Sequence, residues 1–142
     1  MTERILLVDD EEDFVETLAT RLRNRDMVVD TALSGKKAMA LIEKKSFDAV
    51  VLDLQMPDMD GLQVLAAIKE TNPIIQVILL TGRATVEKGI QAMKLGALDL
   101  LEKPADIDDL TDRIKEASEK RMIMITKENE DKIKNILKGK GW

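Results

Sequence analysis

The chain has 142 residues, of which 27 are acidic and 22 are basic, and it contains neither histidine nor cysteine. This length fits one domain of ordinary size with about 20 residues to spare. Without cysteine there can be no disulfide framework, thiolate metal site or thiol catalysis. Without histidine there can be no histidine general base, Ser-His-Asp triad or histidine-ligated zinc. Any chemistry must therefore come from carboxylates, lysine, arginine, hydroxyl groups and a hard cation.

Charge is divided unevenly along the chain. Residues 1–112 carry 13 basic and 22 acidic side chains, a net charge of −9, whereas residues 113–142 carry 9 basic and 5 acidic ones, a net charge of +4. The basic segment has no arginine-rich run and a single aromatic residue, so we interpret it as a solvated helix face and expect no direct nucleic-acid binding. No apolar run approaches a membrane span, and the first eight residues do not read as a signal peptide. We therefore expect a cytoplasmic protein without membrane contact.

Five short apolar runs are predicted to be strands, because each is four or five residues long and most have polar or turn residues close by. Three of them are continuously apolar, as expected when helices cover both faces of a parallel sheet. The predicted strands span residues 5–8, 27–31, 49–52, 77–80 and 98–101.

Helical periodicities lie between and after these runs. Gly35 and Gly61 are expected to open two of the helices and Gly96 to close a third. Five βα units in series predict an α/β fold, a doubly wound five-stranded parallel sheet whose ligands bind at the carboxyl ends of the strands. The apolar stripes are Phe14, Leu18 and Leu22; Ala38, Leu41 and Ile42; Leu62, Leu65 and Ile68; Val86, Ile90 and Met93; and Ile107, Leu110, Ile114 and Ala117.

Chemically active residues stand at four of the predicted strand ends. Asp9 and Asp10 follow the first strand, Asp53 the third, Thr81 the fourth and Lys103 the fifth. Three neighbouring carboxylates need a counter-charge, and oxygen ligands alone select Mg²⁺ over zinc. A carboxylate can also act as a nucleophile and form an acyl phosphate, with a metal, a lysine and a hydroxyl group holding the phosphoryl oxygens.

These segments resemble a known family. VDD after the first strand, LDLQMPDMDG around Asp53, TG at Thr81 and KP at Lys103 have the order and spacing of the receiver domain of two-component response regulators, and GALDLLEKP is similar to the usual approach to the lysine. The resemblance covers residues 3 to about 120. It implies a (βα)5 flavodoxin-like receiver domain over residues 1–120, followed by a C-terminal extension over residues 121–142 that we expect to be helical.

The resemblance also implies how the carboxylates act. Asp53 would accept a phosphoryl group from a sensor histidine kinase. Asp10 would bind Mg²⁺ directly and Asp9 mainly through water, and Asp53 and the backbone carbonyl of Gln55 would complete the protein ligands. Asp53 as a mere strand terminator is a poor alternative, because an acid ending a central strand is costly without a partner.

Lys103 and Thr81 would each bind a phosphoryl oxygen in such a receiver. The bond between Lys103 and Pro104 would be cis, as is usual in the family. Residues 58–61 would form the turn beyond the site. Taken alone, Thr81 is more often only a helix cap or a turn residue, and the functional interpretation depends on the whole constellation.

The acids after Asp10 receive a plainer interpretation. Glu11, Glu12 and Asp13 are predicted to be acids of a first helical turn, favoured there by the helix dipole, and are not included in the site.

One residue departs from the pattern of the family, and two further positions beside the site are variable in it. Leu100 stands where receivers commonly carry an aromatic residue that swings inward, so it either moves as a smaller lever or stays buried. Gln55 and Arg83, each two residues after a site residue, would affect how readily water reaches the acyl phosphate.

The extension leaves three hypotheses open. It folds back on its own domain as an extra helix, pairs with a second subunit, or is a linker cut from a longer protein. Its apolar positions do not keep a clean heptad over residues 121–138, which argues against a long coiled coil.

The sequence favours a phosphorylation-controlled switch that catalyses only its own phosphorylation and dephosphorylation. Its expected partners are the kinase and either a downstream protein or a missing DNA-binding or ATPase output domain. A homodimer through the helices around residues 86–93 and 107–117, or through the extension, is a further hypothesis. The alternative function is a protein-interaction module that keeps the fold and works without phosphorylation.

Overall fold

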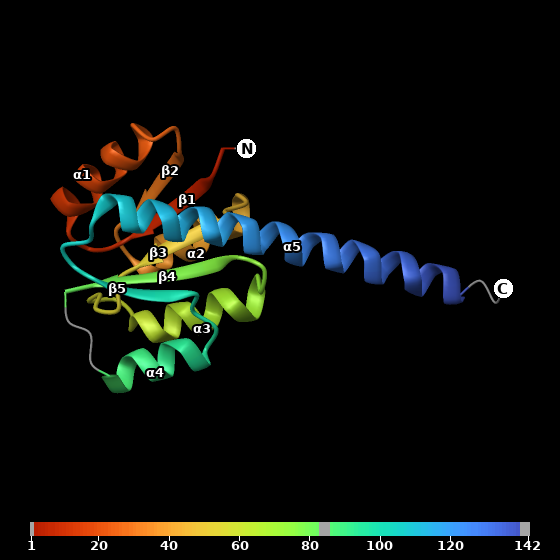
Figure 1. Cartoon of the computed structure of the whole chain (residues 1–142). Coiled ribbons are helices and arrows are strands. Elements are labelled where there is room, and N and C mark those ends of the chain that lie inside the picture. Colours follow the sequence, from red (N-terminus) through yellow and green to blue (C-terminus); the bar gives the residue numbers. More distant parts are fainter. Residues whose placement is uncertain (1, 83–85, 140–142) are drawn as a thin grey trace.

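The computed structural model describes residues 2–82 and 86–139, which form a five-stranded parallel sheet with helices on both faces (Figure 1). The strands pair in the order β2-β1-β3-β4-β5. All the predicted strands and helices are present, which confirms the predicted architecture. In chain order the elements are β1 (Arg4–Val8), α1 (Glu12–Arg23), β2 (Val28–Ala32), α2 (Gly35–Lys44), β3 (Ala49–Leu52), α3 (Gly61–Thr71), β4 (Gln76–Thr81), α4 (Val86–Lys94), β5 (Asp99–Glu102) and α5 (Ile107–Gly139).

The core consists of two layers, one on each face of the sheet. Alternate residues of a strand point to opposite faces, so Leu6 and Leu7 of β1 belong to different layers. Leu7 packs in a cluster with Val15 of α1 and Ile114 of α5, whereas Leu6 belongs to the cluster that contains Leu65 of α3. Helices α1 and α5 cover one face, and α2, α3 and α4 cover the other (Figure 1). Burial of both layers gives the sheet a fixed position from which the loops at its edge project.

The predicted bounds of β3 are confirmed, whereas each of the other four strands differs from its predicted bounds by one residue at one or both ends. The run 77–80 extends to β4 (Gln76–Thr81), and β2 and β5 each begin and end one residue later than predicted. The parallel ladder pairs Thr81 with Glu102, both polar. Backbone hydrogen bonds between strands do not require apolar side chains, so a strand can include polar residues beyond its apolar run. Predictions based on apolar runs alone therefore place some strand ends one residue away from their true positions.

Local capping explains where several helices begin and end. The Ser34 hydroxyl accepts a hydrogen bond from the backbone N–H of Lys37 at 3.2 Å, and thereby caps α2. Gly35 and Gly61 open α2 and α3 as predicted. Gly96 lies two residues beyond α4 with a φ of +99°, a conformation that glycine adopts without steric cost.

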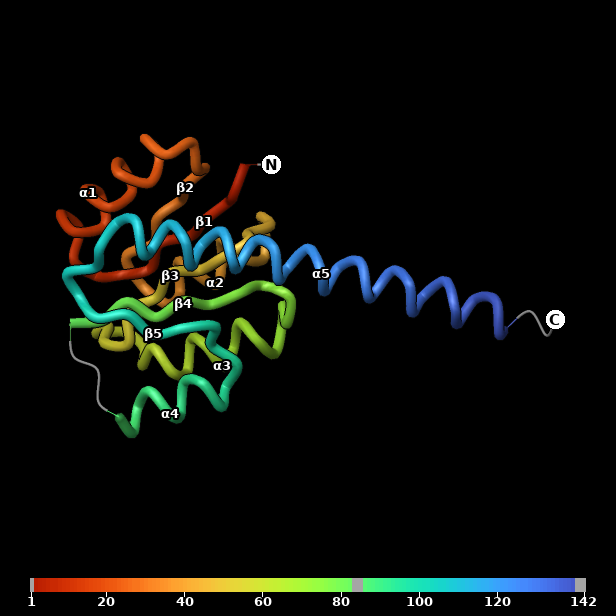
Figure 2. Tube along the Cα trace, viewed as in Figure 1, coloured from red at the N-terminus to blue at the C-terminus, as the bar shows by residue number. Residues whose placement is uncertain are grey.

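The extension is helical, as predicted, but it continues α5 without a break to Gly139 (Figure 2). The hypothesis that it folds back as an extra helix is therefore wrong for the described residues. Residues 107–138 contain neither glycine nor proline, the residues that most readily end a helix. From residue 126 onward every described side chain is exposed. Within residues 2–82 and 86–139, no helix is long and apolar enough to cross a membrane.

Two contacts hold the start of the extension against the domain. Arg121 Nη1 lies 3.2 Å from Asp48 Oδ1, just before β3, and both side chains are largely buried. The Nε2 of Gln76, at the start of β4, donates to the Met124 sulfur at 3.4 Å. The packed part of α5 therefore reaches beyond residue 120, where the sequence placed the end of the domain.

Candidate functional site

The predicted site residues meet at the carboxyl edge of the sheet. Asp9 directly follows β1, Asp53 follows β3, Thr81 is the last residue of β4, and Lys103 follows β5. These four strands are neighbours in the sheet, so a parallel arrangement brings their ends together. Asp53 and Lys103 border an open hollow of about 990 Å³, whose lining also includes Asp10, Glu11, Gln55 and Lys88.

Three carboxylates form the acidic part of the site. One oxygen from each of Asp9, Asp10 and Asp53 lies within 4.8 Å of the others. Asp9 and Asp53 are buried, at 4% and 5% exposure, whereas Asp10 is exposed. A cluster of oxygen ligands, open to solvent on one side, suits a hard divalent cation that retains part of its water shell. The residues present therefore fit a metal ion of that class.

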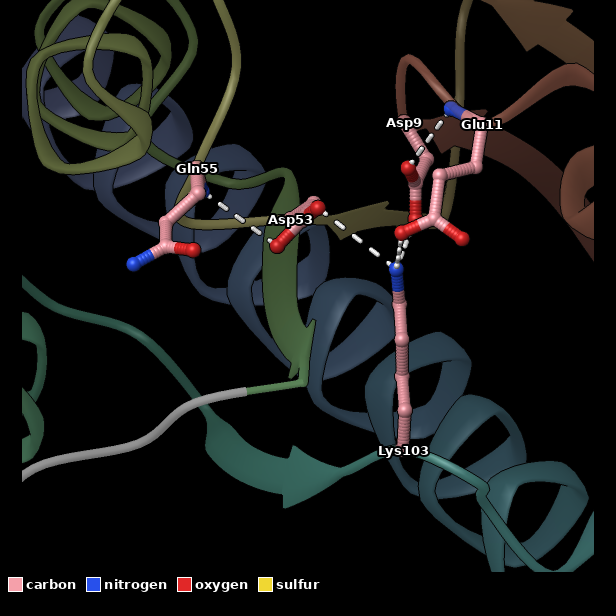
Figure 3. Close-up of polar contacts among 5 residues, drawn as sticks. All are labelled: Asp9, Glu11, Asp53, Gln55 and Lys103. Carbon is pink, nitrogen blue, oxygen red and sulfur yellow. Dashed lines mark hydrogen bonds and ion pairs between the residues drawn. The ribbon is translucent and has the colours of Figure 1, made fainter.

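Lys103 supplies the positive charge of the site (Figure 3). Its Nζ lies 2.6 Å from Asp9 Oδ2, 3.3 Å from Glu11 Oε1 and 3.5 Å from Asp53 Oδ2. The peptide bond between Lys103 and Pro104 is cis, as predicted. The backbone N–H of Lys103 donates to the Thr81 carbonyl at 2.8 Å, which fixes the start of this loop against β4.

Burial and charge change the proton affinities of this pair. Burial raises the pKa of Asp9 above its ordinary 3.8, and the nearby charge of Asp53 acts in the same direction. The hydrogen bonds from Lys103 and from the backbone of Glu11 oppose this without cancelling it. Burial lowers the pKa of Lys103, but the hydrogen bond to Asp9 and the charges of Asp9 and Asp53 outweigh burial and bring the pKa above 10.5. Lys103 is therefore a permanent cation at neutral pH.

The loop after β3 fixes Asp53. Its backbone N–H donates to the Val8 carbonyl at 3.0 Å, and its Oδ1 accepts from the backbone N–H of Gln55 at 3.3 Å. Figure 3 shows the Asp53 carboxylate between Gln55 and Lys103. One carboxylate oxygen is thus turned toward the loop and the other toward the ammonium group.

The turn predicted at residues 58–61 has structural roles of its own. Asp60 caps α3 by accepting from the backbone N–H of Leu62 at 2.9 Å, and its backbone bridges to Gln55. Asp58 accepts from the backbone N–H groups of Gly35 and Lys36 at 3.3 Å each, at the start of α2. These contacts anchor the far side of the loop that carries Asp53.

A close backbone approach explains Gly61. A Cβ atom at this position would lie 2.4 Å from the Leu54 Cα and 2.5 Å from the Asp53 carbonyl oxygen, closer than such atoms can approach. Glycine is therefore required where α3 begins directly beside the backbone of Asp53.

The sequence missed Glu11. We predicted it to be a first-turn acid outside the site, and this is wrong: Glu11 occupies the N-cap position of α1, makes no side-chain cap bond, and contacts Lys103. Glu12 and Asp13 do lie in the first turn, as predicted. Phe14 was also missed as a site neighbour, and its ring centroid lies 4.3 Å from Lys103 Nζ. No local pattern could have revealed either contact, because Lys103 comes some 90 residues later in the chain.

Thr81 and Leu100 occupy the places the sequence suggested. Thr81 is fully buried at the end of β4. Leu100 is partly buried and packs against the core layer covered by α2, α3 and α4. It also lies close to Gly89 of α4, because a Cβ atom added at Gly89 would be 3.2 Å from the Leu100 Cδ2. Arg83, the other predicted neighbour of the site, lies outside the described residues.

Comparison with known proteins assigns the fold to a family. The sequence model of the response regulator receiver domain matches residues 5–115, which include every site residue above and all of the five strands except Arg4, the first residue of β1. The transcriptional regulatory protein ZraR of Salmonella typhimurium is 40% identical over 113 residues, which make up 80% of this chain and 26% of that protein. The chain thus spans about a quarter of the length of this relative.

Solved structures agree with this assignment. A CheY-like response regulator receiver domain protein from Methanospirillum hungatei JF-1 superposes with a TM-score of 0.83 at 27% identity, covering 87% of this chain and 99% of that one. A response regulator protein from Burkholderia pseudomallei, solved with a phosphorylated aspartic acid, calcium ion and citrate, has a TM-score of 0.76 at 29% identity and covers 88% of this chain and 74% of its own.

Proposed function

The chain belongs to the response regulator receiver domain family, and from this membership we propose that it is a switch in which Asp53 accepts a phosphoryl group from a sensor histidine kinase. One observation carries the proposal. A buried carboxylate, Asp53, lies 3.5 Å from an ammonium group and beside two further carboxylates that can share a cation with it. The phosphorylated aspartic acid in the Burkholderia pseudomallei relative supports the same chemistry here.

The transfer itself would proceed by nucleophilic attack. A carboxylate oxygen of Asp53 attacks the phosphorus atom, the bond from phosphorus to the histidine nitrogen of the kinase breaks, and that nitrogen keeps the electron pair. Asp9, Asp10, Asp53 and the backbone carbonyl of Gln55 would hold Mg²⁺. When bound, Mg²⁺ supplies positive charge that offsets the repulsion between the carboxylates and the phosphoryl oxygens.

Lys103 and Thr81 would hold the transferred group. The ammonium of Lys103 is already directed at Asp53, so a modest movement brings it to a phosphoryl oxygen. The hydroxyl group of Thr81 would donate to another phosphoryl oxygen from the end of β4. Binding of the phosphoryl oxygens by the Lys103 ammonium and the Thr81 hydroxyl would stabilise the negative charge that develops during transfer. It would also favour a second conformer of the domain.

The switch would act by changing the affinity for partners. The surface around α4, β5 and α5 carries exposed apolar side chains, among them Val86 at 82%, Ile90 at 52% and Met93 at 50% exposure. Leu100 borders the same surface and packs near Gly89 of α4, so movement of Thr81 could reach the surface through Leu100 as a small lever. Docking of a downstream protein, of an output domain joined to α5, or of a second copy would follow the phosphorylation state.

The only catalysis we propose is the protein's own phosphorylation and dephosphorylation. Gln55 lines the hollow two residues after Asp53, where it can influence the approach of water to the acyl phosphate. The alternative function is an interaction module that works without phosphorylation, and the substitution of an aromatic residue by Leu100 is the observation that favours it.

The test is phosphorylation by acetyl phosphate with Mg²⁺, followed by intact mass. We expect a phosphoryl adduct on the native protein and none on Asp53→Asn, which keeps the shape of the side chain but removes the nucleophile. Omission of Mg²⁺ should abolish the adduct as well. A protein that stays unmodified, even with a histidine kinase as donor, would make the phosphorylation-independent module the better account.

A further inference from the structure

The ammonium group of Lys103 is held by more groups than phosphoryl binding requires. Besides Asp9 and Asp53, its neighbours include the carboxylate of Glu11 at 3.3 Å and the ring of Phe14, whose centroid lies 4.3 Å away. Figure 3 shows the Glu11 carboxylate beside Asp9, on the Lys103 ammonium. Both additional contacts come from the beginning of α1, at positions three residues apart.

The carboxylates that contact Lys103 differ in how freely they can leave it. The side chains of Asp9 and Asp53 are each 6% exposed, whereas that of Glu11 is 63% exposed. Asp9 is also fixed by the backbone N–H of Glu11, which donates to its Oδ1 at 3.0 Å. The Glu11 carboxylate can therefore swing into water with little loss, which the two aspartates cannot do.

We propose that Glu11 is a positioning residue that occupies Lys103 until the phosphoryl group displaces it, and that it thereby slows phosphorylation. This inference rests on the function proposed above. A phosphoryl oxygen and the Glu11 carboxylate are both anionic and compete for the same ammonium group. Phosphorylation must first break the Glu11 ion pair, so the rate and the stability of the phosphorylated state both fall by the net strength of that pair.

Phe14 completes the arrangement without competing. The ring face attracts the ammonium group but carries no net charge, so it can keep its contact while the anionic partner changes. Lys103 thus exchanges the Glu11 carboxylate for a phosphoryl oxygen while its ammonium group stays over the Phe14 ring. It does not have to enter the site from solvent.

The experiment compares Glu11→Gln and Glu11→Asp with Glu12→Gln. Glutamine removes the charge, aspartate keeps the charge on a side chain one methylene shorter, and Glu12 is the adjacent exposed acid that does not line the hollow. Two quantities are measured with saturating Mg²⁺: the rate of phosphorylation by acetyl phosphate, and the affinity for beryllofluoride, a phosphoryl mimic that needs no transfer step. Thermal melts of each variant confirm folding.

We expect Glu11→Gln and Glu11→Asp to be phosphorylated about two- to fivefold faster than the native protein and to bind beryllofluoride more tightly by a similar factor, the range of a partly exposed ion pair. Glu12→Gln should match the native protein. Equal values for Glu11→Gln and the native protein would overturn the inference. A faster Glu11→Gln with a native-like Glu11→Asp, or an equally faster Glu12→Gln, would also overturn it, because the effect would then be one of net charge.

Failure of the proposed function gives a different result. If the native protein neither gains a phosphoryl group nor binds beryllofluoride, the switch itself is wrong and the role of Glu11 falls with it. If the native protein is phosphorylated and the Glu11 variants are not faster, only the inference about Glu11 is wrong.

Discussion

The ammonium group of Lys103 lies 2.6 Å from Asp9 and 3.5 Å from Asp53, so its shorter ion pair is with a proposed metal ligand and not with the proposed phosphoacceptor. The lysine therefore neutralises the acidic cluster in the state described here. A cation bound among Asp9, Asp10 and Asp53 would take over part of that role and leave Lys103 available to a phosphoryl oxygen. Binding of the metal ion would therefore weaken the hold of the carboxylates on the Lys103 ammonium group.

Removal of Lys103 should destabilise the fold when no divalent cation is present. Lys103→Ala leaves Asp9 and Asp53 buried side by side without a counter-charge, and we expect the free energy of unfolding in urea to fall by about 2 kcal/mol, less than for a fully buried pair because the site opens to solvent. Saturating Mg²⁺ should recover part of the loss. Lys127→Ala, on the exposed part of α5, serves as the control. Equal stability of Lys103→Ala and this control would contradict the electrostatic account.

The raised pKa of Asp9 predicts a pH dependence of stability. A carboxyl group with a higher pKa in the folded protein binds its proton more tightly there, so the stability lost through ionisation of Asp9 begins as the pH rises above 3.8 and is complete once the pH exceeds the raised pKa of the folded protein. Asp9→Asn removes this penalty and should raise the free energy of unfolding at pH 7 without divalent cation. The gain should shrink as the pH falls through the raised pKa and should vanish below 3.8, where Asp9 is protonated in the folded and unfolded states alike.

Asp10→Asn is the matched control for that measurement, because Asp10 is exposed. It should change the stability at pH 7 less than Asp9→Asn does. Saturating Mg²⁺ should stabilise both variants less than it stabilises the native protein, since each variant has lost one of the three carboxylates proposed to hold the ion. A lower stability of Asp9→Asn at pH 7 in the absence of cation would show that the Lys103 ion pair outweighs burial.

The close approach of Gly61 to the Asp53 backbone predicts a combined loss of stability and function. Gly61→Ala places a methyl group against the Leu54 Cα and the Asp53 carbonyl oxygen, and we expect it to cost about 2 kcal/mol of unfolding free energy through overpacking. The shift of Asp53 should also slow phosphorylation by acetyl phosphate. Gly139→Ala is the control, because no described atom outside its chain neighbours and the adjoining backbone of α5 lies within 4 Å of the place its methyl group would take. If Gly61→Ala had the stability and the phosphorylation rate of the native protein, the loop that carries Asp53 could move away from the added methyl group at little cost.

The contacts of Arg121 and Met124 predict where the stable part of α5 ends. A chain that stops after residue 126 loses no described residue that is buried, because residues 127–139 are all exposed, and it should keep its unfolding free energy within about 0.5 kcal/mol. A chain that stops after residue 120 loses the ion pair of Arg121 with Asp48 and the hydrogen bond of Gln76 to Met124, and should be about 1 to 2 kcal/mol less stable. Urea denaturation of the two chains measures both values. Equal stabilities would support the domain boundary at residue 120 that the sequence suggested.

Much of the fold could be predicted because its signals are local. Short apolar runs and helical stripes along one chain are read directly from the order of residues, and a series of βα units allows few topologies. Asp9, Asp53, Thr81 and Lys103 could be brought to one edge by the same reasoning, since parallel strands end on the same side of a sheet. The cis bond before Pro104 came from the family resemblance and is present.

Only the tertiary structure decided which side chains touch. The sequence placed Glu11 in a solvated first turn, but its position at the start of α1 beside the end of β5 makes it a partner of Lys103. The sequence also suggested that the domain ends near residue 120, whereas Arg121 forms an ion pair with Asp48, just before β3. Contacts between residues far apart in the chain depend on how rigid elements are packed against one another, and no local periodicity records that packing.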